Sequence, residues 1–151
     1  MKVFINPGHS PNGIPDPGVV SPFSGIQESD VAWSVGNHTS QLLQADGFDT
    51  VLLQTPELVD ISRAANNSFA DVFVSIHCNG SAYHTARGTE TFHYPGSTYG
   101  NILAVAINNQ ITGSIPGIRN RGVKTANFHV LRCTNMPAVL TELAFLDNKD
   151  D

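Results

Sequence analysis

A nearly uninterrupted apolar run, DVFVSIHCNG at residues 71–80, constrains the fold more than any other segment. Continuous apolarity of this kind is typical of a strand that is covered on both faces of its sheet. Such a strand needs helices packed on both sides of the sheet. The surrounding sequence supplies them in alternation with further strands.

The first half of the chain alternates between strand-like and helix-like sequence patterns. Apolar stripes at helical spacing separate short β-rich runs, and Pro56 supplies a favoured first position for the second helix. The expected order is strand 2–6, helix 28–47, strand 49–54, helix 57–70 and strand 71–80. This order predicts parallel strand pairs joined by right-handed crossovers. Within the first helix, Val31, Val35, Leu42 and Leu43 are expected to share one apolar stripe.

The second half predicts more strands around one helix. Ser97 can cap the helix, in which Leu103, Ala106, Ile107 and Ile111 are expected to share a face. The expected elements are strand 88–94, helix 97–113, and strands 127–132 and 138–145. We therefore expect one α/β domain with a mixed, mostly parallel, twisted sheet flanked by helices.

Composition excludes several classes of protein. The 151 residues suit one domain, and a charged fraction of only 14% with 40% apolar residues argues against disorder. The net charge of −5, without any cluster of Lys and Arg, argues against nucleic acid as a partner. No apolar run approaches the roughly 20 residues that span a bilayer, and the N-terminus lacks the pattern of a signal peptide. We expect no membrane insertion.

Two features leave alternatives open. Cys78 and Cys133 are too few for a disulfide framework, and both a single disulfide and two free thiols fit their positions.

The segment INPGHSPNGIPDPGVV, residues 5–20, holds four prolines that stiffen the backbone around His9. Asp16 in this segment fits either a turn or a hydrogen bond that orients a metal ligand.

Four residues with reactive side chains lie where an α/β fold would bring them together. His9 follows the first strand, Glu28 opens the first helix, His77 ends the apolar strand and Glu142 lies in the last one. Strand ends and helix starts meet at one crevice in open α/β sheets. Two histidines and one carboxylate form a ligand set of catalytic zinc sites, and a second carboxylate could take a proton from a bound water.

Several blocks of the sequence resemble one known family. NPGHS with DPG downstream, the glutamate that opens a helix, DVFVSIHCNG and VLRCTNMPAVLTELAFLDN resemble, in this order, the zinc-dependent type 3 N-acetylmuramoyl-L-alanine amidases. The most specific part is the pairing of SIHCN with PAVLTELAFLDN. The resemblance covers essentially the whole chain and implies a phosphorylase/hydrolase-like fold.

The resemblance implies roles for the four residues. His9, Glu28 and His77 would bind one Zn²⁺ ion and Glu142 would be the catalytic carboxylate. The substrate would be peptidoglycan, cut at the amide between the lactyl group of N-acetylmuramic acid and the L-alanine of the stem peptide. The chain would act as a monomer outside the cell, on the bacterial wall, as a phage endolysin or as a domain of a secreted wall hydrolase.

Other acidic and imidazole side chains receive less weight. One of His93 and His129 could face the crevice, whereas His38 and His84 fit structural or solvated positions. Glu90 fits a half-exposed strand and is given no chemistry. Two rival functions use the same groove: a peptidoglycan-binding domain without catalysis, and a zinc peptidase or deacetylase acting on another amide.

The chain departs from the family in three places. It stops at FLDNKDD, where type 3 amidases usually continue into a further helix, so we expect the catalytic domain at residues 1–151 to be truncated at its C-terminus. Gln54 in LLQTP stands where the family often has arginine. The loop after His77 is too short for the autoinhibitory helix of some relatives, which predicts an open cleft.

Overall fold

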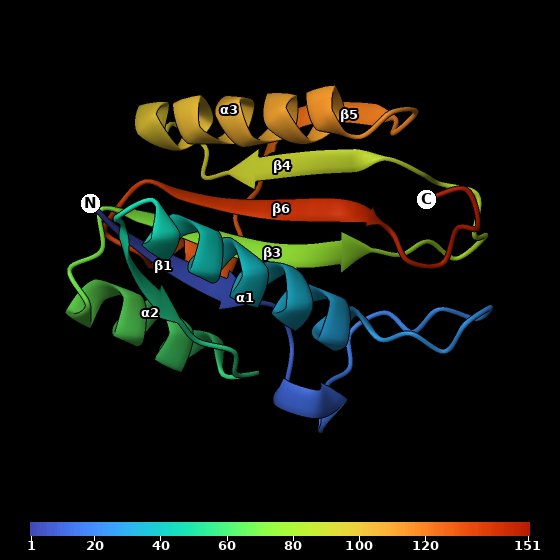
Figure 1. Ribbon diagram of the computed structural model, residues 1–151, viewed down its shortest axis with the longest axis horizontal. Helices are drawn as coiled ribbons and strands as arrows, with labels where there is room; N and C mark the ends of the chain where they lie inside the picture. The colour runs from blue at the N-terminus through green and yellow to red at the C-terminus, as the bar shows by residue number, and fades with distance from the viewer.

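Six strands form one mixed sheet in the order β2-β1-β3-β6-β4-β5 in the computed structural model, which describes all 151 residues (Figure 1). Its strands are β1 (Lys2–Pro7), β2 (Asp49–Leu52), β3 (Val72–Asn79), β4 (Thr89–His93), β5 (Asn120–Thr125) and β6 (Ala138–Phe145). Its helices are η1 (Pro11–Gly13), α1 (Glu28–Ala45), α2 (Leu58–Asn67), α3 (Thr98–Ser114) and α4 (His129–Arg132). The expected α/β class with a mixed, mostly parallel sheet is confirmed.

The directions of the strands show at which edge of the sheet the predicted site residues can meet. β1, β2, β3 and β6 run parallel, and only the β4–β6 pair is antiparallel. In Figure 1 the arrows of β1, β3 and β6 point the same way and that of β4 points back. The carboxyl ends of β1, β3 and β6 therefore meet at one edge, and the segments that follow β1 and β3 begin there.

The two faces of the sheet hold separate cores, because successive strand residues point to opposite faces. On one face, Phe4 stacks on Phe73 at a centroid distance of 5.6 Å, and Leu140 joins the same cluster under α2 and α4. On the other face, Val3 and Ile5 pack with residues of α1. The side chains of His77 and Glu142 lie on the same face as Phe73 and Leu140, because each is an even number of residues from one of these two along its strand.

Small side chains let α1 and α3 approach the sheet closely. The buried positions of α1 include Ala32, Gly36 and Ser40, and those of α3 include Gly100 and Ala104. Larger side chains of both helices line an apolar groove of about 460 Å³ over the sheet, among them Val35, Leu43, Leu103, Ile107 and Ile111.

The prediction of a C-terminal truncation stays a prediction.

Two of the predicted stripe residues do not face the core. Leu42 is 69% exposed on α1, and Ala106 is exposed on α3. The apolar stripe predicts a contact face of large residues, whereas the close contacts are made by smaller ones. Helix α1 lies so close to the sheet that a Cβ on Gly36 would lie 2.8 Å from Pro7 Cγ.

The predicted strand at 127–132 was wrong. Its residues 129–132 form the short helix α4, and the strand beside β4 is instead β5, which pattern alone missed. Val130 and Leu131 are both buried in the α2-side core, a requirement that two successive strand residues could not meet on one face of a sheet. β5 lies at the edge of the sheet and is polar, so it carries little apolar signal.

Smaller differences concern element ends and cysteines. Helix α2 begins at Leu58, two residues after Pro56, and Ser97 caps α3 by accepting a hydrogen bond from the Gly100 amide, as predicted. Both cysteines are free thiols, which decides between the two alternatives. None of the helices combines the length and the apolar character needed to cross a lipid bilayer.

Candidate active site

Three of the four proposed residues meet at the carboxyl end of the parallel strands. His9 Nε2 and His77 Nδ1 each lie 2.9 Å from the same oxygen of Glu28, Oε1. The ligand atoms of the three residues all lie within 4.8 Å of one another. They come from the loop after β1, the first residue of α1 and the carboxyl-terminal half of β3, so the fold unites side chains from three separate segments.

The loop after β1 holds His9 in an unusual backbone conformation. His9 has a φ of +66°, in the left-handed region that residues with a side chain rarely adopt. Two hydrogen bonds close the loop around it: Ser10 N donates to Asp16 O at 2.9 Å, and Asp16 N donates to Ser10 Oγ at 3.1 Å. Backbone strain of this kind persists where surrounding contacts fix it, typically at functional sites.

Asp16 orients the ring of His9. Its Oδ2 lies 2.8 Å from His9 Nδ1, and this hydrogen bond holds the pKa of Asp16 below its ordinary value. Because Nδ1 is engaged, Nε2 is the ring nitrogen that faces Glu28. Both predicted contacts of Asp16 are present, since its other oxygen, Oδ1, accepts a hydrogen bond from Gly18 N at 3.0 Å within the turn. A carboxylate that contacts the ring in this way typically fixes the tautomer of a metal-binding histidine.

Glu28 is buried, with 3% of its surface exposed, yet both of its oxygens are engaged. Cys78 N donates to Oε1 and Val19 N donates to Oε2, each at 2.9 Å. Burial alone would raise the pKa of Glu28, but hydrogen bonds from His77 and His9 hold it well below the ordinary range. The same contacts act on His9: burial opposes its positive charge, and hydrogen bonds to Glu28 and Asp16 outweigh this and raise its pKa to about 9.

Two glycines leave the space that the ligand side chains occupy. A Cβ on Gly8 would lie 2.3 Å from the His77 ring, and one on Gly18 would lie 2.5 Å from Glu28 Oε2 and 2.6 Å from the His9 ring. Gly18 also has a φ of +68°. Any larger residue at either position would displace a ligand side chain.

Glu142 lies beside this cluster. It is paired with His77 across the parallel β3–β6 ladder, so the two side chains are neighbours on one face of the sheet. Its Oε2 is buried and has no hydrogen-bond partner. Burial, together with the negative charges of Glu28 and Glu90, raises the pKa of Glu142 to about 8.

A cleft of about 280 Å³ opens over these residues. His9, His77 and Glu142 line it, together with Leu58, the first residue of α2, and Phe128, which directly precedes α4. No helix lies between β3 and β4, so none covers His77 from that connection, in keeping with the predicted open cleft.

The family model described as N-acetylmuramoyl-L-alanine amidase matches residues 3–151. The chain belongs to this family. Among individual members, it is 36% identical to N-acetylmuramoyl-L-alanine amidase CwlM of Bacillus licheniformis over 162 residues, covering 100% of this chain and 59% of the relative. It is 37% identical to the endolysin of Bacillus phage SPP1 over 161 residues, covering 99% of this chain and 56% of the relative. The chain thus spans a little over half the length of these two curated relatives.

A solved amidase structure shares the fold. The N-acetylmuramoyl-L-alanine amidase AmiC2 of Nostoc punctiforme superposes with a TM-score of 0.89 at 31% identity, covering 99% of this chain and 82% of that one. The likeness therefore extends over nearly all of this chain, including the strands and loops that carry His9, Glu28, His77 and Glu142.

A second carboxylate on the same face of the sheet as Glu142 was given no role from the sequence. Glu90 is 4% exposed, not half-exposed as predicted, and faces Glu142 across the β4–β6 pair. Lys124 Nζ donates to its Oε2, Asn79 Nδ2 donates to its Oε1 at 2.6 Å, and Arg121 lies within ion-pair distance. Burial opposes its ionisation, but these partners hold the pKa of Glu90 below its ordinary value. The cations of RGVK at 121–124 were the signal that could have revealed it.

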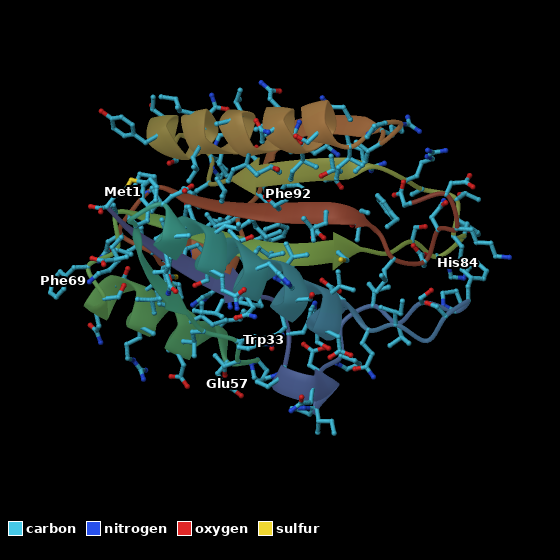
Figure 2. The ribbon with its side chains drawn as sticks, in the orientation of Figure 1. Met1, Trp33, Glu57, Phe69, His84 and Phe92 are labelled. Atoms are coloured by element: carbon cyan, nitrogen blue, oxygen red, sulfur yellow. The ribbon has the colours of Figure 1, made fainter.

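The remaining histidines of the amidase domain divide as the sequence suggested. His129 lines the cleft, whereas His93 is buried and bonds to the Tyr94 carbonyl. His38 lies on α1 and bonds to a carbonyl within that helix. His84 is exposed at the end of the molecule near the C-terminus, where it bonds to Asp147 at 2.7 Å (Figure 2).

The three-residue cluster fits a tetrahedral metal ion. Ligands bound to zinc at about 2.0–2.1 Å lie about 3.3 Å apart, close to the 2.9 Å separations of each histidine nitrogen from Glu28 Oε1. Two imidazoles and a carboxylate are also ligands that Zn²⁺ accepts in catalytic sites, where a fourth position stays open. The residues present could therefore hold one metal ion.

Proposed function

We propose that residues 1–151 form the catalytic domain of a zinc-dependent N-acetylmuramoyl-L-alanine amidase. The bond cut is the amide between the lactyl group of N-acetylmuramic acid and the L-alanine of the peptidoglycan stem peptide. The observation that carries the proposal is the placement of Glu142: a carboxylate oxygen without a partner lies beside a complete His–Glu–His ligand set in an open cleft. Membership of the amidase family supplies the substrate class.

His9, Glu28 and His77 are assigned as the metal ligands. When bound there, Zn²⁺ supplies a Lewis acid that polarises a carbonyl and lowers the pKa of a water to about 7. Asp16 holds the His9 ring with Nε2 toward the metal position, and the amides of Cys78 and Val19 fix the Glu28 carboxylate. The ligand set is thus preorganised by hydrogen bonds from its own loops.

Glu142 is assigned as the general base and then the general acid. Its carboxylate, which lines the cleft, accepts a proton from the attacking water and delivers it to the departing nitrogen of alanine. A well-placed group of this kind contributes roughly a hundred- to ten-thousandfold to the rate. Its position next to His77 in the sheet register keeps the carboxylate within the cleft that the amide must enter.

The cleft is open to a polymeric substrate. Leu58 and Phe128, 51% and 40% exposed, form an apolar part of the wall of this cleft. An extended peptide could lie between this wall and the metal ligands without any segment having to open. We assign peptidoglycan outside the cell membrane as the site of action and a monomer as the active form.

Two other functions use the same geometry. A zinc peptidase or deacetylase would need the same four side chains, since the zinc and glutamate chemistry does not itself choose between amides. A binding domain without catalysis would have no need for an unpartnered carboxylate oxygen beside the ligand set. Family membership favours the muramoyl amide over both.

Digestion of purified peptidoglycan, followed by mass spectrometry of the new chain ends, tests the proposal. We expect free L-alanine amino termini and peptide-free glycan, lost with a zinc chelator and restored by added Zn²⁺. New ends within the stem peptide would show a peptidase, and loss of N-acetyl groups would show a deacetylase. A folded, zinc-loaded protein that produces no new ends would overturn the enzymatic assignment.

A further inference from the structure

Gln54 connects the segments that carry two of the proposed metal ligands. It follows β2, and its side chain is buried, with 8% of the residue exposed. Its Nε2 donates two hydrogen bonds, to Gly8 O and to Ser29 O, each at 2.9 Å. Gly8 directly precedes His9, and Ser29 directly follows Glu28.

The bond to Gly8 acts on the strained part of the site. Gly8 O and His9 N belong to the same peptide unit, and the φ angle of His9 is the rotation that follows this unit. A donor fixed on Gly8 O therefore restrains the peptide unit that precedes this rotation. It helps to keep His9 in the left-handed conformation, with a φ of +66°. Gly8 N is fixed as well, since it donates to Ile76 O at 2.8 Å, directly before His77.

The bond to Ser29 acts on the start of α1. Ser29 lies in the first turn, next to Glu28, and is itself buried. One amide nitrogen thus ties the loop after β1 to the beginning of α1. Backbone hydrogen bonds from Glu28 N to Val19 O and from Ser29 N to Pro17 O also join these two segments. Gln54 adds a contact from a third segment, directly beside His9 and Glu28.

We propose that Gln54 is a positioning residue for the metal site, holding the backbones of His9 and Glu28 at the separation that the ion requires. This inference rests on the proposed metal site. Gln54 touches neither the ligand side chains nor the cleft, so its effect is on metal affinity and not on the chemical step. Groups that orient metal ligands typically change affinity or activity ten- to a hundredfold when they are removed.

The test compares zinc affinity with stability in two matched variants. Gln54→Met keeps the length of the side chain and removes both hydrogen bonds. Asn108→Leu is the control: Asn108 is also buried, and its amide donates to Asn120, on segments that carry none of the ligand set. Zinc dissociation constants are measured by competition with a chromophoric chelator, and melting temperatures are measured on the same metal-free samples.

We expect Gln54→Met to bind zinc about ten- to a hundredfold more weakly, and Asn108→Leu to melt at a lower temperature with unchanged zinc affinity. Gln54→Leu, which also lacks a donor, should weaken zinc binding as the Met variant does and serves if that variant does not fold. Unchanged zinc affinity in a folded Gln54 variant, or an equal loss in Asn108→Leu, would overturn the positioning role. A wild-type protein that binds no zinc would overturn the metal site itself.

Discussion

Glu28 and Glu90 are both almost fully buried carboxylates, and their surroundings differ in one respect. Glu90 is held by Lys124 and Arg121, whose positive charges are permanent at neutral pH. Glu28 is held by two histidines, whose ring nitrogens can release a proton and take up a metal ion instead. A buried carboxylate with fixed cations is a structural ion pair, whereas one with imidazole partners is a candidate ligand set.

Glu142 lies between these two and resembles neither. It neighbours His77 on one side and Glu90 on the other, and one of its oxygens has no partner. Both Glu28 and Glu90 have pKa values below the ordinary range, while that of Glu142 is raised to about 8. The proposed roles of these three carboxylates differ with what surrounds each: Glu28 as a metal ligand, Glu142 as a proton carrier and Glu90 as part of a structural ion pair.

The largest expected effect is the loss of a ligand. His77→Ala should abolish zinc binding and reduce amide hydrolysis to the background rate, because a histidine nitrogen is removed from a set of only three protein ligands. Metal content by atomic absorption and release of L-alanine amino termini measure the two effects. Zinc retained at one ion per chain in this variant would remove His77 from the ligand set.

Glu142→Gln should separate metal binding from catalysis. The glutamine keeps the shape of the side chain but cannot carry the proton, so we expect activity to fall by roughly a hundred- to ten-thousandfold with zinc affinity retained. Rates on purified peptidoglycan at saturating zinc, together with zinc titration, measure this. Turnover close to that of wild type would show that another group carries the proton.

Asp16→Asn should have a smaller effect, because it changes the orientation of a ligand and not its presence. Loss of the carboxylate at His9 Nδ1 is expected to weaken zinc binding by about ten- to a hundredfold. Competition with a chelator measures the affinity. If the Asp16→Asn variant binds zinc as tightly as the wild type does, Asp16 serves only to form the turn and does not orient the ligand.

Glu90→Gln should alter stability and leave zinc affinity unchanged. Removing the charge from a buried carboxylate that accepts charged hydrogen bonds costs about 1.5–3 kcal/mol of unfolding free energy. The folded-state pKa of Glu90 lies below its unfolded value, so its stabilising contribution is present above the ordinary carboxyl range and disappears as the pH falls through the folded pKa. Denaturant unfolding from neutral to acid pH should show the wild type and the variant converging at low pH. A zinc affinity that falls along with stability would place Glu90 in the metal site.

The sequence named the side chains that the structure brings together in the candidate site, but not the residues that surround them. Histidine and glutamate at strand ends and at a helix start carry a recognisable chemistry, and the resemblance of the motifs assigned each role. Glu90 and Gln54 carry no such signal: a glutamate in a strand and a glutamine in a loop are ordinary residues until their partners are known. Their partners include Lys124, 34 residues from Glu90, and Gly8, 46 residues from Gln54.

The fold, too, has elements that the sequence predicts and elements that it does not. The alternation of β1, α1, β2, α2 and β3 follows from local periodicity, since a helix and a strand repeat their apolar positions at different intervals. The polar edge strand β5 and the helix α4 do not follow from it. Val130 and Leu131 indicate a strand by composition, and only the need to bury both in one core makes the segment helical.

By itself, the sequence determined which segments are strands and helices in the first half of the chain, and which side chains can bind a metal. The tertiary structure alone decided that His77, Glu142 and Glu90 lie side by side and that Gln54 reaches both Gly8 and Ser29. Periodicity is a property of neighbouring residues and can be read along the chain. Strand register and the partners of a buried amide depend on packing between distant segments, which no local pattern encodes.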